Sequence, residues 1–161
     1  METIYLAGGC FWGVEKFFSQ FEGVINTEVG YANGEVEGTS YEELYKTGHA
    51  ETVKIEYDPD IISLEKLLDY YFMIIDPLSI NKQGPDAGRQ YRTGIYYTLD
   101  SQLTHINKVV DKVEEKLRNR IAVEVEPIRN YQTAEEYHQK YLDKHPGGYC
   151  HIRRDMFHLE D

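Results

Sequence analysis

Cysteine is scarce in this chain: only Cys10 and Cys150 occur among its 161 residues. Small secreted domains held by disulfides use cysteine far more densely, and structural zinc sites need several ligands at a recurring spacing. One distant cysteine and the adjacent pair Cys150-His151 make no such spacing, so we predict no metal site. Two cysteines then indicate either inert core thiols or a reactive pair.

Long apolar runs are also missing. The longest, such as residues 70–75, are far too short to span a bilayer, and Glu2 stands where a secretory signal would carry positive charge. We therefore expect no membrane partner and a cytoplasmic location. No Ser/Pro-rich linker, repeat or low-complexity tract is present, which predicts one domain over 1–161 with a glycine-rich tail at about 145–161 that carries Cys150.

Positive charge is the third deficit. Seventeen Lys and Arg face 28 Asp and Glu, a formal net charge of -11, and the basic residues are scattered along the chain. A polyanion would meet net repulsion, so we expect no nucleic-acid partner.

Short strand patterns alternate with helical ones. Because the strands are half polar rather than continuously apolar, they favour a two-layer α+β sandwich, with helices against one face of a largely antiparallel sheet, over a parallel doubly wound sheet. The expected strands are 3–7, 24–31, 51–57, 91–98 and 121–128, and the expected helices follow residue 10 and cover 63–75 and 101–119. Thr133-Ala134-Glu135-Glu136 is a capping box, which predicts a last helix to about Lys144.

Cys10 lies where the first strand turns into the first helix, behind Gly8-Gly9. A helix start offers unpaired N–H groups and a positive dipole end, which favour thiolate over thiol, so this position predicts a nucleophile. A buried structural cysteine is the alternative, and from Cys10 alone it is the commoner case. Phe11 and Trp12 follow at once, and a helix start cannot hide three large neighbouring side chains, so at least one should face outward or into a pocket.

Glu51 stands on the same strand face as Val53 and Ile55. A carboxylate there lies either at the rim of the sheet or in a desolvated place that raises its pKa and makes it a proton donor near neutral pH. Asp86 belongs to a long polar loop, a type of segment that often carries function, although Asp beside Gly and Pro commonly only holds a turn. Cys150 is either incidental or a mobile thiol able to resolve a sulfenic acid on Cys10.

Taken together, these segments resemble the A-type peptide methionine sulfoxide reductases. The matching motifs run in order along nearly the whole chain. They are Gly9-Cys10-Phe11-Trp12-Gly13 with Glu15, Gly30-Tyr31, Tyr41-Glu42-Glu43, Gly48-His49-Ala50-Glu51, Tyr57-Asp58-Pro59, Asp76-Pro77, Asn81, Gln83-Gly84, Asp86, Gln90-Tyr91 and Tyr137-His138-Gln139.

The resemblance implies a two-layer α/β sandwich with a mixed sheet, a ferredoxin-like plait, and reduction of methionine-S-sulfoxide, free or in proteins, without a cofactor. It makes Cys10 the nucleophile and Glu51 the acid that protonates the sulfoxide oxygen. Three further positions carry over in the same way: Tyr41 and Tyr91 hold that oxygen, and Asp86 orders the polar site.

Two more roles follow from the resemblance. Phe11 and Trp12 cradle the S-methyl group, and Cys150 resolves the Cys10 sulfenic acid as a disulfide that an external dithiol such as thioredoxin reduces. The chain departs from the common pattern at Ile75, Leu78 and Pro85, none of which carries a chemical role. A peroxide-reducing thiol enzyme and a redox-sensitive binding module are the alternatives, and neither explains why Glu51 accompanies the cysteine motif.

Overall fold

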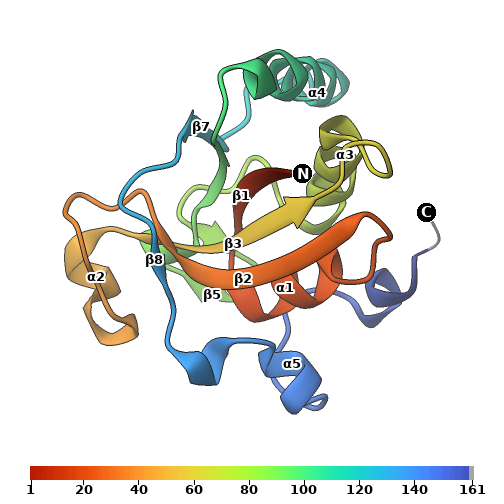
Figure 1. The fold of residues 1–161 in the computed structure, drawn as a ribbon. Coiled ribbons are helices and arrows are strands. Elements are labelled where there is room, and N and C mark those ends of the chain that lie inside the picture. Colours follow the sequence, from red (N-terminus) through yellow and green to blue (C-terminus); the bar gives the residue numbers. More distant parts are fainter. Residues whose placement is uncertain (160–161) are drawn as a thin grey trace.

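The computed structural model describes residues 1–159, so the last two residues of the predicted domain and tail lie outside the described ones. A six-stranded sheet forms the centre, in the order β7-β6-β1-β3-β2-β8 (Figure 1). Strands β6 and β7 are parallel and every other neighbouring pair is antiparallel, which confirms the mixed, largely antiparallel sheet. The strands are β1 Glu2–Gly8, β2 Val24–Ala32, β3 Ala50–Tyr57, β6 Thr93–Tyr97, β7 Glu124–Pro127 and β8 Gln132–Thr133.

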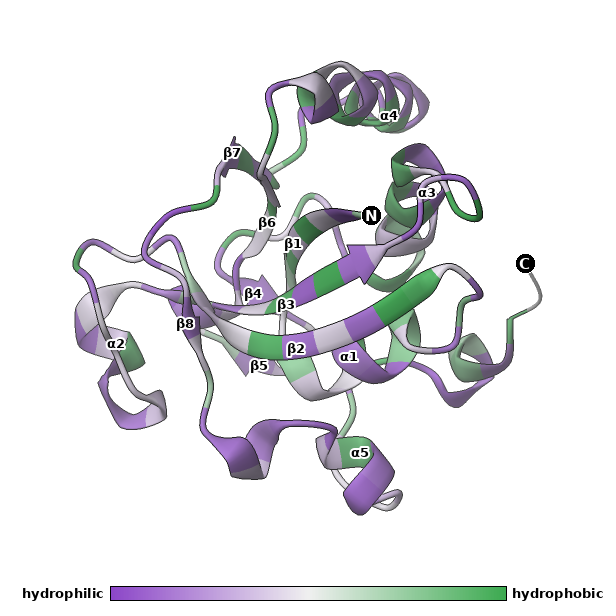
Figure 2. Cartoon of the chain, viewed as in Figure 1, coloured by the Kyte–Doolittle hydropathy of each residue, from purple (hydrophilic) through white to green (hydrophobic). Residues whose placement is uncertain are grey.

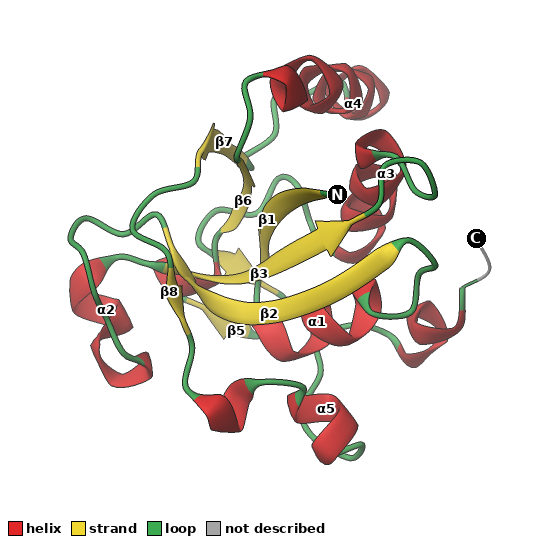
Figure 3. Ribbon diagram, in the orientation of Figure 1, coloured by secondary structure: helices red, strands yellow, loops and turns green. Residues whose placement is uncertain are grey.

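The central connectivity is β1-α1-β2-β3-α3-β6, and these four strands lie in the order β6-β1-β3-β2. This is the ferredoxin-like plait, two split βαβ units, and it confirms the expected two-layer α+β fold. Figure 3 shows the helices and the irregular segments around this sheet. The helices are α1 Phe11–Phe18, α2 Leu44–Thr47, α3 Leu64–Ile74, α4 Ser101–Leu117 and α5 Tyr141–Lys144. A two-residue hairpin, β4 Lys82–Gln83 with β5 Asp86–Ala87, lies in the long polar loop.

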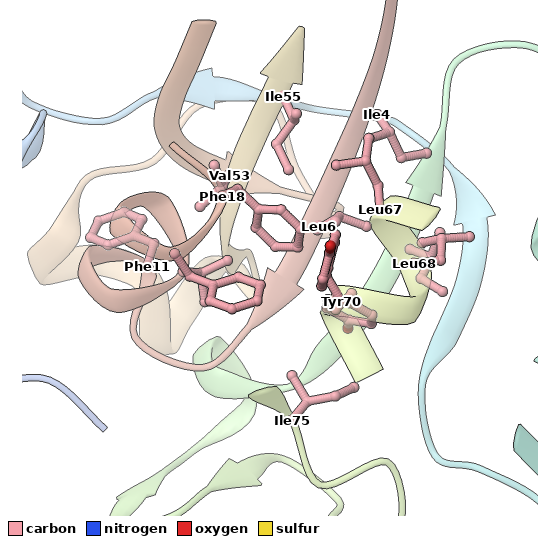
Figure 4. Packing of buried hydrophobic residues seen from close by; sticks show 14 of the residues in the cluster. Ile4, Leu6, Phe11, Phe18, Val53, Ile55, Leu67, Leu68, Tyr70 and Ile75 are labelled. Atoms are coloured by element: carbon pink, nitrogen blue, oxygen red, sulfur yellow. The ribbon is translucent and has the colours of Figure 1, made fainter. Parts of the chain in front are cut away.

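The main core lies between the sheet and helices α1 and α3. Ile4 and Leu6 of β1 and Val53 and Ile55 of β3 are fully buried on this face and pack against both helices (Figure 4). Burying each such side chain contributes about 1.5–3 kcal/mol to folding. Glu51 belongs to the same alternation on β3 and is only 2% exposed, so the buried position is confirmed and the rim position is wrong.

The opposite face of the sheet is covered by loop rather than helix. Tyr5 of β1 packs on Tyr131, with ring centroids 4.8 Å apart, over a small cluster that includes Ala7, Ala50 and Tyr96. Helix α4 packs beside α3 and keeps its polar residues outward (Figure 2). No helix among residues 1–159 is long and apolar enough to cross a bilayer.

The last predicted helix is wrong. Residues 133–144 form the end of β8, a 3-10 turn at Glu136–His138 and the short helix α5, and Lys140 has φ of 55°. The capping box does not form, because the Thr133 hydroxyl, which would cap the helix, donates instead to Oε1 of Glu28 on β2 at 3.0 Å. Glu135 accepts hydrogen bonds from the Tyr31 hydroxyl and the Tyr41 N–H. Contacts to distant strands therefore override the local helix signal.

Glu15 of α1 holds this broken segment in place. Its buried carboxylate accepts bonds from the Lys140 N–H at 2.8 Å and the Lys140 ammonium at 3.0 Å, and a third from the Thr27 hydroxyl at 2.9 Å. The segment that follows β8 is thereby fixed against α1.

We expect Glu15→Ala to lower the free energy of unfolding by about 3 kcal/mol, because the Lys140 N–H and the Thr27 hydroxyl lose their buried acceptor and the Lys140 ammonium keeps only its bonds to Thr27. Asp143→Ala is the matched control, since the Lys16–Asp143 ion pair also joins α1 to α5 but lies at the surface. Exposed pairs of this kind contribute about 1 kcal/mol or less. Urea unfolding of both variants measures the difference, and equal losses would contradict the role given to Glu15.

Candidate active site

Cys10 occupies the tight connection between β1 and α1. Gly9 has φ of 89°, and a Cβ there would lie 2.8 Å from Cβ of Gln83, so only glycine allows this turn. Cys10 is the N-cap residue of α1, and the residue is 7% exposed. The turn therefore presents the sulfur at the start of a helix, as the sequence predicts.

One cavity of about 280 Å³ lies over Cys10. Its walls come from the start of α1, from the 3-10 turn at Tyr41–Glu43, from β3, from the polar loop and from the C-terminal segment. Its lining residues are Cys10, Phe11, Trp12, Tyr41, Glu51, Asp86, Tyr91 and Tyr149. The fold thus brings together every predicted site residue except Cys150.

Glu51 enters the cavity as a buried acid. Its Oε1 accepts a hydrogen bond from the Phe11 N–H at 3.2 Å, whereas its buried Oε2 has no partner within residues 1–159. Burial raises the pKa of this carboxyl, the Phe11 N–H lowers it in part and the negative charge of Asp86 adds to the rise, so that the pKa lies at about 8. At neutral pH Glu51 is therefore mostly protonated, and its hydroxyl can donate a hydrogen bond to a ligand in the cavity.

The predicted thiolate at Cys10 is wrong for the resting site. Burial raises the pKa of the thiol, the Glu51 charge raises it further, and the Trp12 N–H at the helix start lowers it only in part. Desolvation therefore outweighs the helix terminus. Below a pH of about 8 the repulsion from Glu51 disappears, because the carboxyl is neutral. The resting site holds a thiol and a carboxylic acid side by side.

Tyr41 and Tyr91 supply two hydroxyl groups joined by a hydrogen bond. Burial raises the pKa of both phenols, and the Glu51 charge adds to the effect, so both remain protonated donors at neutral pH. Tyr91 lies in a 3-10 turn, Arg89–Tyr91, just before β6 rather than inside the predicted strand. This turn points the phenol toward Glu51 and Tyr41 instead of into the sheet.

An aromatic wall closes another side of the cavity. Phe11 is 1% exposed and packs on Tyr31, whereas Trp12 is only partly buried, which confirms that one of the two rings faces outward. Trp12 stacks on Tyr141 with ring centroids 3.7 Å apart, and its indole N–H donates to Nδ1 of His138 at 3.1 Å. Burial lowers the pKa of His138, so the ring stays neutral and accepts this bond.

Three residues of this site are absent from the sequence-based prediction. His138 and Tyr141 fix the Trp12 ring, and Tyr149 donates from its hydroxyl to Oδ2 of Asp86 at 2.8 Å. His138 is part of the Tyr137-His138-Gln139 motif, which was the available signal. Tyr141 and Tyr149 could not be found from sequence spacing. The chain turns sharply at Lys140, and this turn, rather than a regular helix, decides where both side chains lie.

Cys150 lies outside the cavity lining and against the first turns of α1. It is partly buried, and Ile152 donates its N–H to Sγ at 3.4 Å. Its neighbour His151 donates from Nε2 to the Gly8 carbonyl oxygen at 3.0 Å, which ties the segment to the β1–α1 connection. Within residues 1–159, no group of three or more His, Cys, Asp or Glu side chains is arranged to hold a metal ion.

A comparison with protein-family models decides the family. The model described as peptide methionine sulfoxide reductase matches residues 2–160. The chain belongs to the peptide methionine sulfoxide reductase family. It is 54% identical over 158 residues to the peptide methionine sulfoxide reductase MsrA of Lachnoclostridium phytofermentans, with 97% of this chain and 95% of that protein covered.

Solved structures agree with this membership. The reduced form of Mxr1 from Saccharomyces cerevisiae matches with a TM-score of 0.87 at 41% identity, covering 92% of this chain and 88% of Mxr1. Mxr1 in complex with Trx2 matches with a TM-score of 0.63 at 32% identity, covering 87% and 84%. This peptide methionine sulfoxide reductase therefore shares the fold of its relatives, and a large part of their sequence, over nearly its whole length.

Proposed function

We propose that this reductase converts methionine-S-sulfoxide, free or in proteins, to methionine, with Cys10 as nucleophile and Glu51 as the proton donor. The observation that carries the proposal is the pair in the cavity: a protonated carboxyl with an unpartnered Oε2, beside a thiol. A sulfoxide sulfur is a poor electrophile until its oxygen is protonated, so it needs this acid.

The reaction balances with these two groups. Glu51 protonates the sulfoxide oxygen as the Cys10 sulfur attacks the substrate sulfur, and the Cys10 proton restores the acid. The oxygen ends on Cys10, so one sulfoxide and one thiol give methionine and a Cys10 sulfenic acid. Attack at a neutral pair avoids placing two buried negative charges side by side, which the raised pKa values of both groups disfavour.

The remaining cavity residues fix the substrate. Phe11 and Trp12 form the apolar wall for the S-methyl group, Tyr41 and Tyr91 hold the oxygen near Glu51, and Asp86 orders the polar side. Sulfoxide sulfur is a stereocentre, so fixing its methyl group, its oxygen and the direction of attack admits one epimer only.

Cys150 completes the proposed cycle by attacking the sulfenic acid and forming a Cys10–Cys150 disulfide. An external dithiol such as thioredoxin regenerates the two thiols by exchange, and the match to Mxr1 in complex with Trx2 supports this type of partner. We assign no bound cofactor, and because the cycle needs a reducing compartment, we propose a cytoplasmic location. The whole activity is assigned to one domain over residues 1–161.

The deciding experiment is stereospecific. Purified protein with dithiothreitol is given the separate S and R epimers of a methionine sulfoxide compound, and methionine formation is followed by chromatography. We expect the S epimer alone to be reduced. Reduction of both epimers, or of neither, would contradict the proposal.

Measuring the rate of hydrogen peroxide consumption distinguishes the proposed sulfoxide reductase from the alternative, a thiol peroxidase. That reaction needs Cys10 and Cys150 but neither the acid nor the aromatic wall, so Glu51→Gln would leave it intact. We expect peroxide turnover to be far slower than sulfoxide turnover in the unmodified protein.

A further inference from the structure

Gly13 has no side chain at the point where Cys150 touches α1. A Cβ at this position would lie 2.9 Å from Sγ of Cys150 and 3.2 Å from Cδ1 of Ile152. The backbone itself does not demand glycine, because Gly13 is an ordinary residue of α1 and is not among the residues with positive φ. Glycine inside a helix is about 0.5–1 kcal/mol less favourable than alanine. The close approach of the Cys150 sulfur therefore explains why this helical position is glycine.

Gly13 also lies one turn from the reactive thiol. Cys10 is the N-cap residue of α1 and Gly13 is the third residue of the helix, and an N-cap side chain lies against the N–H groups of the second and third residues of its helix. A sulfur resting on Gly13 is therefore a short movement from Cys10. Disulfide geometry requires Cα atoms about 4.4–6.8 Å apart, which a shift of the C-terminal segment over this face can provide.

Contacts on both sides of Cys150 keep it at this place. The Tyr149 hydroxyl bonds to Asp86 at 2.8 Å, and His151 bonds to the Gly8 carbonyl at 3.0 Å. The thiol is thus held beside α1 in the reduced protein and does not have to be captured from solution.

We propose that Gly13 is a positioning residue for the resolving step: its missing side chain opens the resting place from which Cys150 reaches Cys10. The inference rests on the proposed function. Cys150 Sγ attacks Cys10 Sγ of the sulfenic acid, the S–O bond breaks as the S–S bond forms, and hydroxide leaves with the Cys150 proton as water. No further oxidant or reductant is needed.

Gly13→Ala tests this role in the full-length, reduced protein. One equivalent of methionine-S-sulfoxide is added without reductant, and samples are quenched over time for methionine, free thiols and Cys10 sulfenic acid trapped with dimedone. We expect methionine to form within about twofold of the unmodified rate, because the cavity is untouched. Loss of the second thiol should slow by about tenfold or more, with sulfenic acid accumulating at Cys10.

Gly147→Ala is the matched control, because a Cβ there would meet nothing within 4 Å although Gly147 lies in the same C-terminal segment. Both of its rates should equal those of the unmodified protein. Gly13→Ser should repeat the effect of Gly13→Ala, and melting temperatures verify that both variants are folded.

The outcomes separate the two proposals. If the unmodified protein forms the Cys10–Cys150 disulfide and Gly13→Ala forms it equally fast, the role of Gly13 is wrong while the proposed function stands. Equal slowing of methionine formation and thiol loss in Gly13→Ala would also overturn it, by indicating a general structural defect. If the unmodified protein forms methionine without that disulfide, the resolving step itself is wrong.

Discussion

Glu51→Gln should lower the rate of methionine formation in a single turnover by about 10²–10⁴-fold, the range that a positioned general acid supplies. Glutamine has nearly the same shape, and its amide oxygen still accepts the Phe11 N–H that Oε1 now accepts at 3.2 Å. Its amide N–H is far too weak an acid to transfer a proton to the sulfoxide oxygen. The loss therefore reports the chemistry of the group rather than its packing.

The pH profile gives the second half of this prediction. The pKa of Glu51 is raised to about 8, so the acid form is present below that pH and is lost above it. The rate of methionine formation by the unmodified protein should fall as the pH rises through about 8. Glu51→Gln should be slow at every pH and should not show this decrease. Rapid-quench measurements from pH 6 to 10 provide both curves.

Glu56→Gln is the control for both measurements. It makes the same chemical change on the same strand, but Glu56 faces away from the cavity and bonds to Asn26. Its rates and its pH profile should match those of the unmodified protein. A Glu51→Gln variant with unchanged rates would remove the acid from the mechanism.

Cys10→Ser should abolish methionine formation, a loss of at least about 10⁴-fold, because a hydroxyl at neutral pH is a far weaker nucleophile toward sulfur. The residue is buried and its side chain is replaced by one of similar size, so the fold should persist. Near-normal turnover of this variant would exclude Cys10 as the nucleophile.

Cys150→Ser is the matched variant that separates the role of the resolving thiol from that of the nucleophile. It should form one methionine per protein at the unmodified rate and then stop in the absence of reductant, with a sulfenic acid at Cys10. Dithiothreitol should restore turnover, because a small thiol reduces the sulfenic acid directly. Quantifying methionine against protein distinguishes the two cysteines, and a Cys150→Ser variant without this single burst would contradict their order of action.

Much of the fold could be predicted because its signals are local. The alternation in β1 and β3 and the helical spacing in α3 and α4 are readable within single elements, and all four exist as expected. The predicted helix at 133–144 failed because Glu15, more than a hundred residues away, takes the Lys140 N–H and bends the chain there. A local capping signal cannot compete with a buried charged acceptor.

The sequence by itself determined which chemical groups this protein has and in what order, and strand parity alone put Glu51 on the buried face. Only the tertiary structure decided their states. The helix start at Cys10 indicates a thiolate, yet burial raises its pKa and that of Glu51, so the resting pair is neutral. Desolvation depends on every segment that closes the cavity, and those segments come from across the whole chain. The place of Cys150 against Gly13 depends likewise on packing between the two ends of the chain, which no spacing within either end encodes.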